Sequence, residues 1–178
     1  MPPARRTRGT EALPGAADSR LFTLEVSLVS GPVQECFLKK NRVMSRTIQI
    51  RADQTLQDLH DAIFSAFDRW DDHLYEFQIG GKGPMDPKAR RYTIAPDEDG
   101  FGNRPREAGL VSRTTLGSLG LKVDDPFGYW FDFGDDWYHQ VSVAAIETRA
   151  PAGRFPRVTA RIGKSPPQYP DAEGGEDE

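Results

Sequence analysis

Cysteine is almost absent from this chain of 178 residues, which contains Cys36 alone. A single thiol excludes an intramolecular disulfide, and it also excludes a zinc cage built from several cysteines. Proteins with so little cysteine are typical of a reducing compartment. We therefore expect a protein of the cytoplasm whose fold is stabilised without disulfides.

Long hydrophobic runs are missing as well. No apolar stretch approaches the roughly 18 residues that a membrane-spanning helix needs. The arginines close to the N-terminus are not followed by an apolar segment, which excludes a secretory signal of the usual kind. The sequence predicts no membrane contact, in agreement with a cytoplasmic location.

The chain also lacks a large excess of one sign of charge. It has 23 Lys and Arg against 27 Asp and Glu, a formal net charge of −4. Bulk electrostatics therefore do not attract the molecule to a polyanion, and contact with nucleic acid would require a local basic face. Apolar residues make up only 37%, beside 14 prolines and 17 glycines, which indicates that part of the chain lies outside the packed core.

The composition divides the chain into one domain between two tails. Residues 1–20 are rich in Ala, Pro, Gly and Arg, and residues 166–178 end in Gly, Asp and Glu, so we expect both to be disordered. Residues 21–165 form the expected domain, which is long enough to bury a core. Within it, residues 80–113 contain several prolines and glycines and are expected to form a long loop or insertion.

Hydrophobic alternation predicts strands at residues 21–30, 47–51 and 74–79, with 36–46 as the outer part of a hairpin between the first two. A further strand-like run covers residues 91–95 inside the expected long loop.

A helix is predicted between the second and third strands. Thr55 and Asp58 have the spacing of a capping box. Apolar residues then recur at three- and four-residue intervals, which places one apolar stripe against a sheet. The stripe contains Leu56, Leu59, Ile63, Phe64, Phe67 and, as a candidate member, Trp70. A short second helix is expected through Leu116 and Leu119.

The order strand, hairpin tip, strand, helix, strand is that of a β-grasp. We therefore predict an α+β fold: a β-grasp-like mixed sheet with one main helix packed across it. A C-terminal antiparallel hairpin, with strands beginning at Phe127 and Trp137, would extend this sheet.

The turn of that hairpin decides which residues meet across it. A three-residue loop at 134–136 pairs Phe133 with Trp137 and brings both apolar faces to one side, with His139 among them. A two-residue loop pairs Asp132 with His139 and divides the aromatic rings between the two sides. Burial of one coherent apolar face is worth several kcal/mol at ~25 cal/mol per Å2, so we expect the three-residue loop.

The hairpin also resembles a known family. The string Tyr129 to His139, which reads YWFDFGDDWYH, is similar to the hallmark of the plasmid pRiA4b ORF-3-like family, whose members are also described as insertion-sequence passenger proteins of the TnpR type. The resemblance extends through residues 22–80 and takes in residues 116–119. It implies a β-grasp-like α+β fold and a plasmid or mobile-element setting, but it supplies no established activity.

The C-terminus departs from this family's pattern. Many relatives have a Pro-Pro-Glu-Asp stretch followed by Cys and paired glycines, whereas residues 166–169 of this chain read PPQY without a following cysteine. Metal or redox roles that the resemblance attaches to that stretch are therefore not carried over.

The acidic turn of the hairpin allows two interpretations. Carboxylates with one imidazole suit Mg or Mn, so Asp132, Asp135, Asp136 and His139 could bind a metal and support a metal-dependent enzyme. Alternatively, Asp135 and Asp136 are turn residues whose side chains bind nearby backbone amides, and His139 is a core histidine. The second interpretation is favoured, and the sequence predicts no cofactor.

No catalytic motif stands out elsewhere in the sequence. An enzyme of nuclease or recombinase type needs a metal cage, or a nucleophile with an activating partner. The available serines and tyrosines lie in no recognisable nucleophile motif, so we predict a protein that is not an enzyme.

Two binding functions remain. Basic residues that could contact nucleic acid, with one aromatic ring for stacking, are Lys39, Lys40, Arg42, Arg46, Lys88, Arg90, Arg91 and Tyr92. The favoured hypothesis is a binding or scaffold module for another protein, because exposed sheet edges accept partner strands. Trp130, on the face opposite the main aromatic stripe, and Tyr138 are the expected contacts. The oligomeric state is left open.

Overall fold

The computed structural model describes residues 17–94 and 107–170. Residues 1–16 and 171–178 of the two expected tails, and residues 95–106 of the expected long loop, lie outside the described residues. The elements are β1 (Leu21–Ser30), α1 (Glu35–Lys40), β2 (Ser45–Arg51), α2 (Leu56–Ala66), β3 (Tyr75–Ile79), β4 (Arg90–Thr93), β5 (Glu107–Leu110), the 3-10 helices η1 (Val111–Arg113) and η2 (Leu116–Leu119), β6 (Pro126–Phe131), β7 (Trp137–Glu147) and β8 (Arg157–Ile162).

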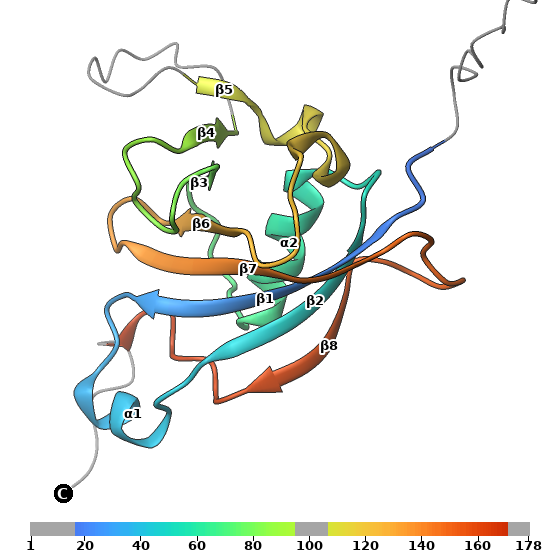
Figure 1. Ribbon diagram of the computed structural model, residues 1–178. Coiled ribbons are helices and arrows are strands. Elements are labelled where there is room, and N and C mark those ends of the chain that lie inside the picture. Colours follow the sequence, from blue (N-terminus) through green and yellow to red (C-terminus); the bar gives the residue numbers. More distant parts are fainter. Residues whose placement is uncertain (1–16, 95–106, 171–178) are drawn as a thin grey trace, which may run out of the picture.

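All eight strands belong to one sheet, in the order β5-β4-β3-β6-β7-β1-β2-β8. Neighbours are antiparallel apart from β4 and β5, which run parallel. Figure 1 shows α2 behind this sheet, where it covers one face. The predicted α+β class is thus confirmed. The β-grasp-like description is not confirmed for this sheet of eight strands.

The helix α2 begins as its sequence predicts. The Thr55 hydroxyl accepts a hydrogen bond from the Asp58 backbone N–H at 3.1 Å, and the Asp58 carboxylate accepts one from the Thr55 N–H at 2.7 Å. This capping box satisfies two N–H groups that the first turn leaves without a helical partner. The helix ends at Ala66, and Asp68 follows with a positive φ of 56°.

Trp70 therefore does not belong to the apolar stripe. The helix stops four residues before it, and 72% of the Trp70 surface is exposed. Most of the remaining predicted stripe is buried against the inner face of the sheet, as expected of an amphipathic helix. The buried members are Leu56, Leu59, Ile63 and Phe67, while Phe64 is partly buried against the core.

The connection between β1 and β2 contains more structure than a hairpin tip. The two strands pair as expected, with Phe22 opposite Ile50. Between them, α1 replaces the predicted outer hairpin, and Gly31 begins the connection. A Cβ atom at Gly31 would lie 2.3 Å from Cε3 of Trp137, so only glycine allows the backbone to pass this close to the indole.

The β6–β7 hairpin has a longer turn than predicted. Phe131 pairs with Trp137, and Tyr129 pairs with His139, so the loop spans residues 132–136. This register differs from the predicted one by two residues, and it therefore keeps the same face buried. That face contains Phe127, Tyr129, Phe131, Trp137, His139, Val141 and Val143, as expected. Phe133, which was expected in this stripe, lies in the turn instead.

Parts of both expected tails contribute to the packed structure. At the N-terminal end, the Arg20 carbonyl accepts from the Ala52 N–H at 2.9 Å, and the Ser19 carbonyl accepts from the Ala150 N–H at 2.6 Å. At the C-terminal end, Gln168 is buried. The expected long loop likewise contains β4, β5 and η1. No described helix has the length and apolar character that crossing a membrane requires.

The capping box gives a first testable prediction. Replacing Thr55 by Ala removes the acceptor for the Asp58 N–H, and should lower the free energy of unfolding by about 1 kcal/mol. Chemical denaturation followed by far-UV circular dichroism would measure this change. Ser65→Ala, at an exposed position of the same helix, is the control and should leave stability unchanged or slightly raised, because alanine favours helix. Equal stability of the wild type and Thr55→Ala would contradict the prediction.

Candidate functional site

The hairpin turn at residues 132–136 is organised by aspartate side chains. Asp132 and Asp136 have positive φ values of 58° and 57°, a conformation that aspartate tolerates better than most residues. The Asp132 Oδ1 atom accepts from the N–H groups of Gly134 at 3.0 Å and of Asp135 at 3.2 Å. These contacts are those of an Asx turn. The Asp132 side chain thus stabilises the backbone of its own turn.

The four residues considered as metal ligands point in different directions. His139 is only 1% exposed and faces the core, whereas Asp136 lies at the exposed turn. Asp132 is directed to the turn amides and Asp136 to two aromatic side chains. Within residues 17–94 and 107–170, no group of three or more His, Cys, Asp and Glu side chains has the arrangement of a metal site.

Trp130 and Tyr138 lie side by side on the sheet face opposite α2, as their alternation predicts. They pair across β6 and β7, and their rings are 5.6 Å apart. Phe133 leaves the core and packs on Trp130 at 4.2 Å between ring centroids. We call these three residues, Trp130, Phe133 and Tyr138, the outer aromatic cluster.

A single carboxylate holds two members of the outer aromatic cluster. Asp136 Oδ1 accepts from the Trp130 indole N–H at 3.0 Å and from the Tyr138 hydroxyl at 3.2 Å. Partial burial and this carboxylate raise the pKa of Tyr138, so the hydroxyl stays protonated and donates at neutral pH. The two rings are thereby joined through one carboxylate.

A buried ion pair lies beside this cluster. Glu76, which is opposite Trp130 in the register of β3 and β6, is fully buried. Its Oε1 atom accepts from the Gln78 side chain at 2.8 Å and forms an ion pair with Arg91. Pro84 covers Gly128, which lies two residues before Trp130 in β6. A Cβ atom at Gly128 would lie 2.8 Å from the Cα atom of Pro84. The described part of the expected loop therefore covers Gly128.

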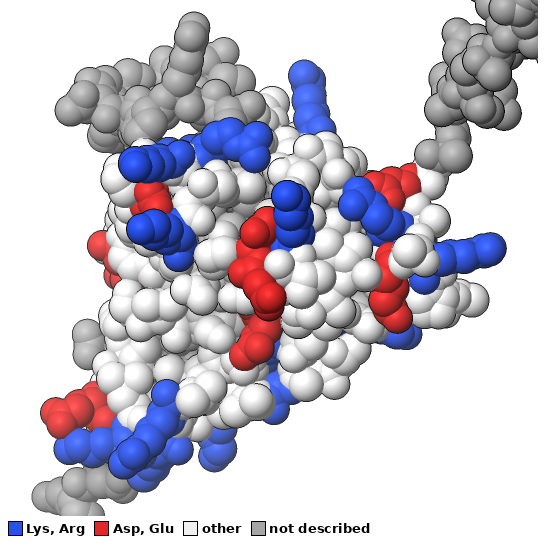
Figure 2. Space-filling view, viewed as in Figure 1, with Lys and Arg blue, Asp and Glu red and all other residues white. Residues whose placement is uncertain are grey.

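The residues considered for nucleic-acid contact fall into two sets. Arg46, Arg91 and Tyr92 serve the fold: Arg46 and Tyr92 are buried, and Arg91 pairs with Glu76. The exposed members are Lys39, Lys40, Arg42, Lys88 and Arg90. Figure 1 places α1 and β4 at different ends of the molecule, and in Figure 2 basic side chains gather at these two margins with acidic side chains between them. The two basic groups do not form one continuous face in this view.

A second polar cluster lies where residues 166–170 pack on the segment after α2. The Gln168 side chain accepts from the N–H groups of Trp70 at 3.0 Å and Asp71 at 3.2 Å, and donates to the Asp71 carbonyl at 2.7 Å. The Tyr169 hydroxyl donates to Asp71 Oδ2 at 2.6 Å, which raises the pKa of Tyr169 to about 12. We call this set of contacts the C-terminal latch.

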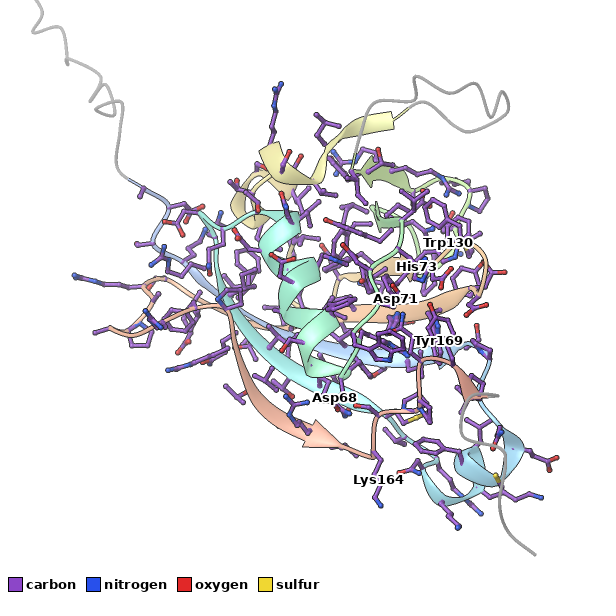
Figure 3. The ribbon with its side chains drawn as sticks, turned by 180° about the vertical axis from the view of Figure 1, so that it is seen from behind. Asp68, Asp71, His73, Trp130, Lys164 and Tyr169 are labelled. Carbon is purple, nitrogen blue, oxygen red and sulfur yellow. The ribbon has the colours of Figure 1, made fainter. Side chains whose placement is uncertain are left out.

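His73 joins the C-terminal latch to the hairpin turn. Its Nε2 atom lies 2.7 Å from the Tyr169 hydroxyl, 3.4 Å from Asp71 Oδ2 and 3.5 Å from Asp132 Oδ2. Figure 3 shows Asp71, His73 and Tyr169 next to one another on the side of the sheet that carries α2. Our sequence interpretation missed this cluster because it assigned the PPQY string to a tail.

The interior of the domain contains polar groups that no sequence pattern indicated. The Arg69 guanidinium lies 3.6 Å from the centre of the Trp137 ring, and its nitrogens have no hydrogen-bond partner among the described residues. Burial lowers the pKa of Arg69 to about 10, so the group is still charged at neutral pH. The cation–π contact with Trp137 compensates part of the cost of burying this charge.

Two histidines are buried in their neutral form. Burial and the neighbouring Arg69 charge lower the pKa of His139 to about 3. Burial lowers the pKa of His60 to about 4, while its Nδ1 atom lies 2.8 Å from the Tyr129 hydroxyl. The 3.6 Å contact between His60 and Asp72 is therefore not an ion pair at neutral pH.

Comparison with known proteins gives the chain its family. Residues 37–175 match the model of the plasmid pRiA4b ORF-3-like proteins. The chain belongs to this family. The matched region spans most of the sequence, including α2, the outer aromatic cluster and the C-terminal latch, so the resemblance inferred from the hairpin motif is confirmed.

The fold of this pRiA4b ORF-3-like protein is similar to a solved structure. That structure is the crystal structure of the protein of unknown function MM3350 from Methanosarcina mazei Go1, with a TM-score of 0.61 and 22% sequence identity over 84% of this chain and 73% of that chain. At this identity the similarity shows the fold alone. No curated protein matches this chain.

The two buried histidines give a prediction of pH dependence. In the unfolded chain both imidazoles have the ordinary pKa of about 6.5, whereas burial lowers both values in the folded state. The unfolded state therefore binds more protons below pH 6.5, and the free energy of unfolding should fall as the pH drops from 6.5 towards 4, by at most about 1.4 kcal/mol per pH unit for each imidazole.

Urea denaturation at several pH values would measure this slope, and His139→Leu should remove about half of it. Imidazole NMR signals provide an independent check. If the signals of His60 and His139 in the folded protein titrate with midpoints near 6.5, the prediction is wrong.

The C-terminal latch gives a further prediction. Gln168→Ala leaves two backbone N–H groups and one carbonyl without their partner, which should cost about 1–3 kcal/mol and speed hydrogen exchange at the Trp70 and Asp71 amides. Chemical denaturation and amide exchange would measure both effects. Gln57→Ala, at an exposed position of α2, is the matched control. Unchanged exchange at Trp70 and Asp71 in Gln168→Ala would contradict a latching role.

Proposed function

We propose that this protein is a non-enzymatic binding module from a plasmid or mobile-element context, and that it holds a basic segment of another protein on the outer aromatic cluster. The observation that carries the proposal is the pair of hydrogen bonds from Trp130 and Tyr138 to the single acceptor Asp136 Oδ1. An aromatic surface that is fixed in advance loses little entropy when a partner binds.

The chemistry of the cluster is that of a binding hot spot. Tryptophan and tyrosine dominate such sites because each supplies a large rigid contact area and a polar handle. Phe133 supports Trp130 from the turn, with 4.2 Å between the ring centroids, and neighbouring Gly128 is covered by Pro84. A partner side chain would therefore meet rings that are held in place on an otherwise polar sheet face.

Charge selects the kind of partner. The Asp135 carboxylate has no hydrogen-bond or ion-pair partner among the described residues, since only its backbone N–H is engaged. An arginine or lysine side chain could lie on the aromatic faces and reach this carboxylate, which combines a cation–π contact with an ion pair. A basic segment is thus a better match than an acidic or purely apolar one.

Other functions have less support from the geometry. A metal-dependent enzyme at the turn would need His139 beside the carboxylates, and that imidazole faces the core. A nucleic-acid-associated role through the first connection and the long loop would use two exposed basic groups that lie at different margins of the molecule. The family match adds a plasmid-type context without a named activity.

Removal of the indole tests the proposal. Trp130→Ala should weaken binding of a defined Arg- and Lys-rich peptide by about thirtyfold, which is the effect of losing a hot-spot residue of about 2 kcal/mol. Asp135→Asn should weaken it as well, because the charge is lost at constant shape. Fluorescence anisotropy with a labelled peptide would measure both affinities.

The controls separate recognition from general effects. Trp70→Ala, which removes the most exposed tryptophan from a different part of the molecule, should leave peptide affinity unchanged. A peptide with Glu in place of Arg and Lys should not bind. Equal affinity of the wild type and Trp130→Ala for the basic peptide, or no binding by the wild type, would refute the proposal.

A further inference from the structure

A cleft of about 620 Å3 lies between the segment after α2 and the chain that follows β8. This volume is within the range of about 300–1,000 Å3 that is common for small-molecule sites. Its walls come from four parts of the sequence: Arg46 of β2, the loop that carries Asp68 and Trp70, the end of β8, and residues 163–169. In Figure 3 the label of Asp68 marks the loop after α2, and the labels of Lys164 and Tyr169 mark residues 163–169.

Positive charge prevails in the cleft. Arg46, Arg161 and Lys164 line it together with one carboxylate, that of Asp68. The Asp68 carboxylate already accepts a hydrogen bond from the Ser165 hydroxyl at 2.5 Å. Two positive charges are therefore left uncompensated within the cleft, which favours an anionic ligand.

The three cations differ in their freedom to bind such a ligand. Arg46 is buried, and its guanidinium donates to Ala66, Ser45 and Ser165, among others. It contributes charge, and each of its three nitrogens is already engaged in at least one hydrogen bond. Arg161 is exposed, and only its Nη1 atom is engaged among the described residues, with the Ala66 carbonyl.

The exposed Lys164 ammonium has no partner within the described part of the chain, where only its backbone N–H is hydrogen-bonded, to Asn41 at 2.9 Å. Arg161 and Lys164 are thus the available donors. Arg161 lies near the end of β8, and Lys164 lies two residues after this strand ends, so the same part of the chain carries both cations.

An aromatic wall adjoins these cations. Trp70 lines the cleft with 72% of its surface exposed, which is unusual for so large an apolar side chain. Its ring lies edge-on to Tyr169, with 5.6 Å between the ring centroids. The C-terminal latch fixes both residues, because Gln168 binds the Trp70 backbone and Tyr169 binds Asp71. The backbone of Trp70 is thereby held, and its indole is exposed beside the Tyr169 ring.

We infer that this cleft binds a nucleoside phosphate, with the base stacked on Trp70 and the phosphate bound by Arg161 and Lys164. A ligand that is only an anion would make no use of the exposed Trp70 indole. A ligand that is only an uncharged ring would make no use of Arg161 and Lys164. Stacking on an aromatic side chain beside basic residues is the common way to bind a nucleotide unit without reading its sequence. The ligand could be a free nucleotide or one unit of a single strand.

This site is independent of the proposed protein-binding function. Figure 3 shows Lys164 and Trp130 at well-separated places in the molecule, and the two sites share no residue. Failure of one proposal therefore leaves the other standing, and the two tryptophan variants distinguish them.

Binding can be tested on the full-length protein with four probes: AMP, adenosine, inorganic phosphate and an oligothymidylate of about ten nucleotides, a length that spans the usual single-strand site. Isothermal titration calorimetry at low salt would give the affinities, and the Trp70 indole N–H signal in NMR spectra would report contact. We expect AMP to bind at least about tenfold more tightly than adenosine or phosphate, because it engages both halves of the site. AMP should shift the Trp70 signal and leave that of buried Trp137 in place.

Variants then test the two halves of the site. Trp70→Ala and Lys164→Glu should each weaken AMP binding by about tenfold or more, through lost stacking and reversed charge respectively. Both residues are exposed, so both variants are expected to fold. Lys122→Glu, which makes the same charge change at an exposed position outside the cleft, is the matched control and should bind AMP as the wild type does.

The outcomes separate the two ligand sources. Binding of the oligothymidylate at least tenfold tighter than AMP identifies a single strand as the ligand, whereas equal or weaker binding identifies a free nucleotide. Both results support the inference. It is overturned if neither AMP nor the oligothymidylate moves the Trp70 signal at millimolar concentration, or if Trp70→Ala and Lys164→Glu bind AMP as tightly as the wild type.

Discussion

The pairing of β7 with two different partners is the constraint on which the rest of the structure depends. On one side β7 pairs with β6, which leads to β3, β4 and β5, and on the other side it pairs with β1, which leads to β2 and β8. These two halves of the sheet meet only along β7 among the described strands. Trp137, His139, Val141 and Val143 occupy alternate positions of β7 and are buried, so any shift of its register by one residue would expose this row and break both ladders.

This constraint explains what the sequence could and could not reveal. The capping box of Thr55 and Asp58 is a local signal and was predicted correctly, as was the buried face of the hairpin, because both depend on residues close in sequence. The order of strands depends on contacts between distant segments. Nothing in the alternation of residues 21–30 indicates that β7, more than a hundred residues later, pairs with β1.

The residues whose positions were predicted wrongly have one property in common. Tertiary contacts, and not local sequence, decide where these side chains lie. Arg46 was counted as a surface cation, yet it is buried where several backbone carbonyls satisfy its guanidinium. Gln168 was placed in a tail because residues 166–178 end in Gly, Asp and Glu, yet it completes the hydrogen bonding of an irregular segment after α2. Trp70 fits the helical spacing, but the helix ends before it. Buried charge and exposed tryptophan are departures from composition rules, and such departures concentrate at functional sites.

The close approach of Gly31 to Trp137 links two regions that are remote in sequence. The indole of Trp137 is contacted by the backbone of the first connection and by the guanidinium of Arg69. A larger residue at position 31 would displace the ring, and with it the cation that stacks on the ring. A substitution at position 31 would consequently be transmitted through the tryptophan to Arg69, in a segment that has no direct sequence connection to it.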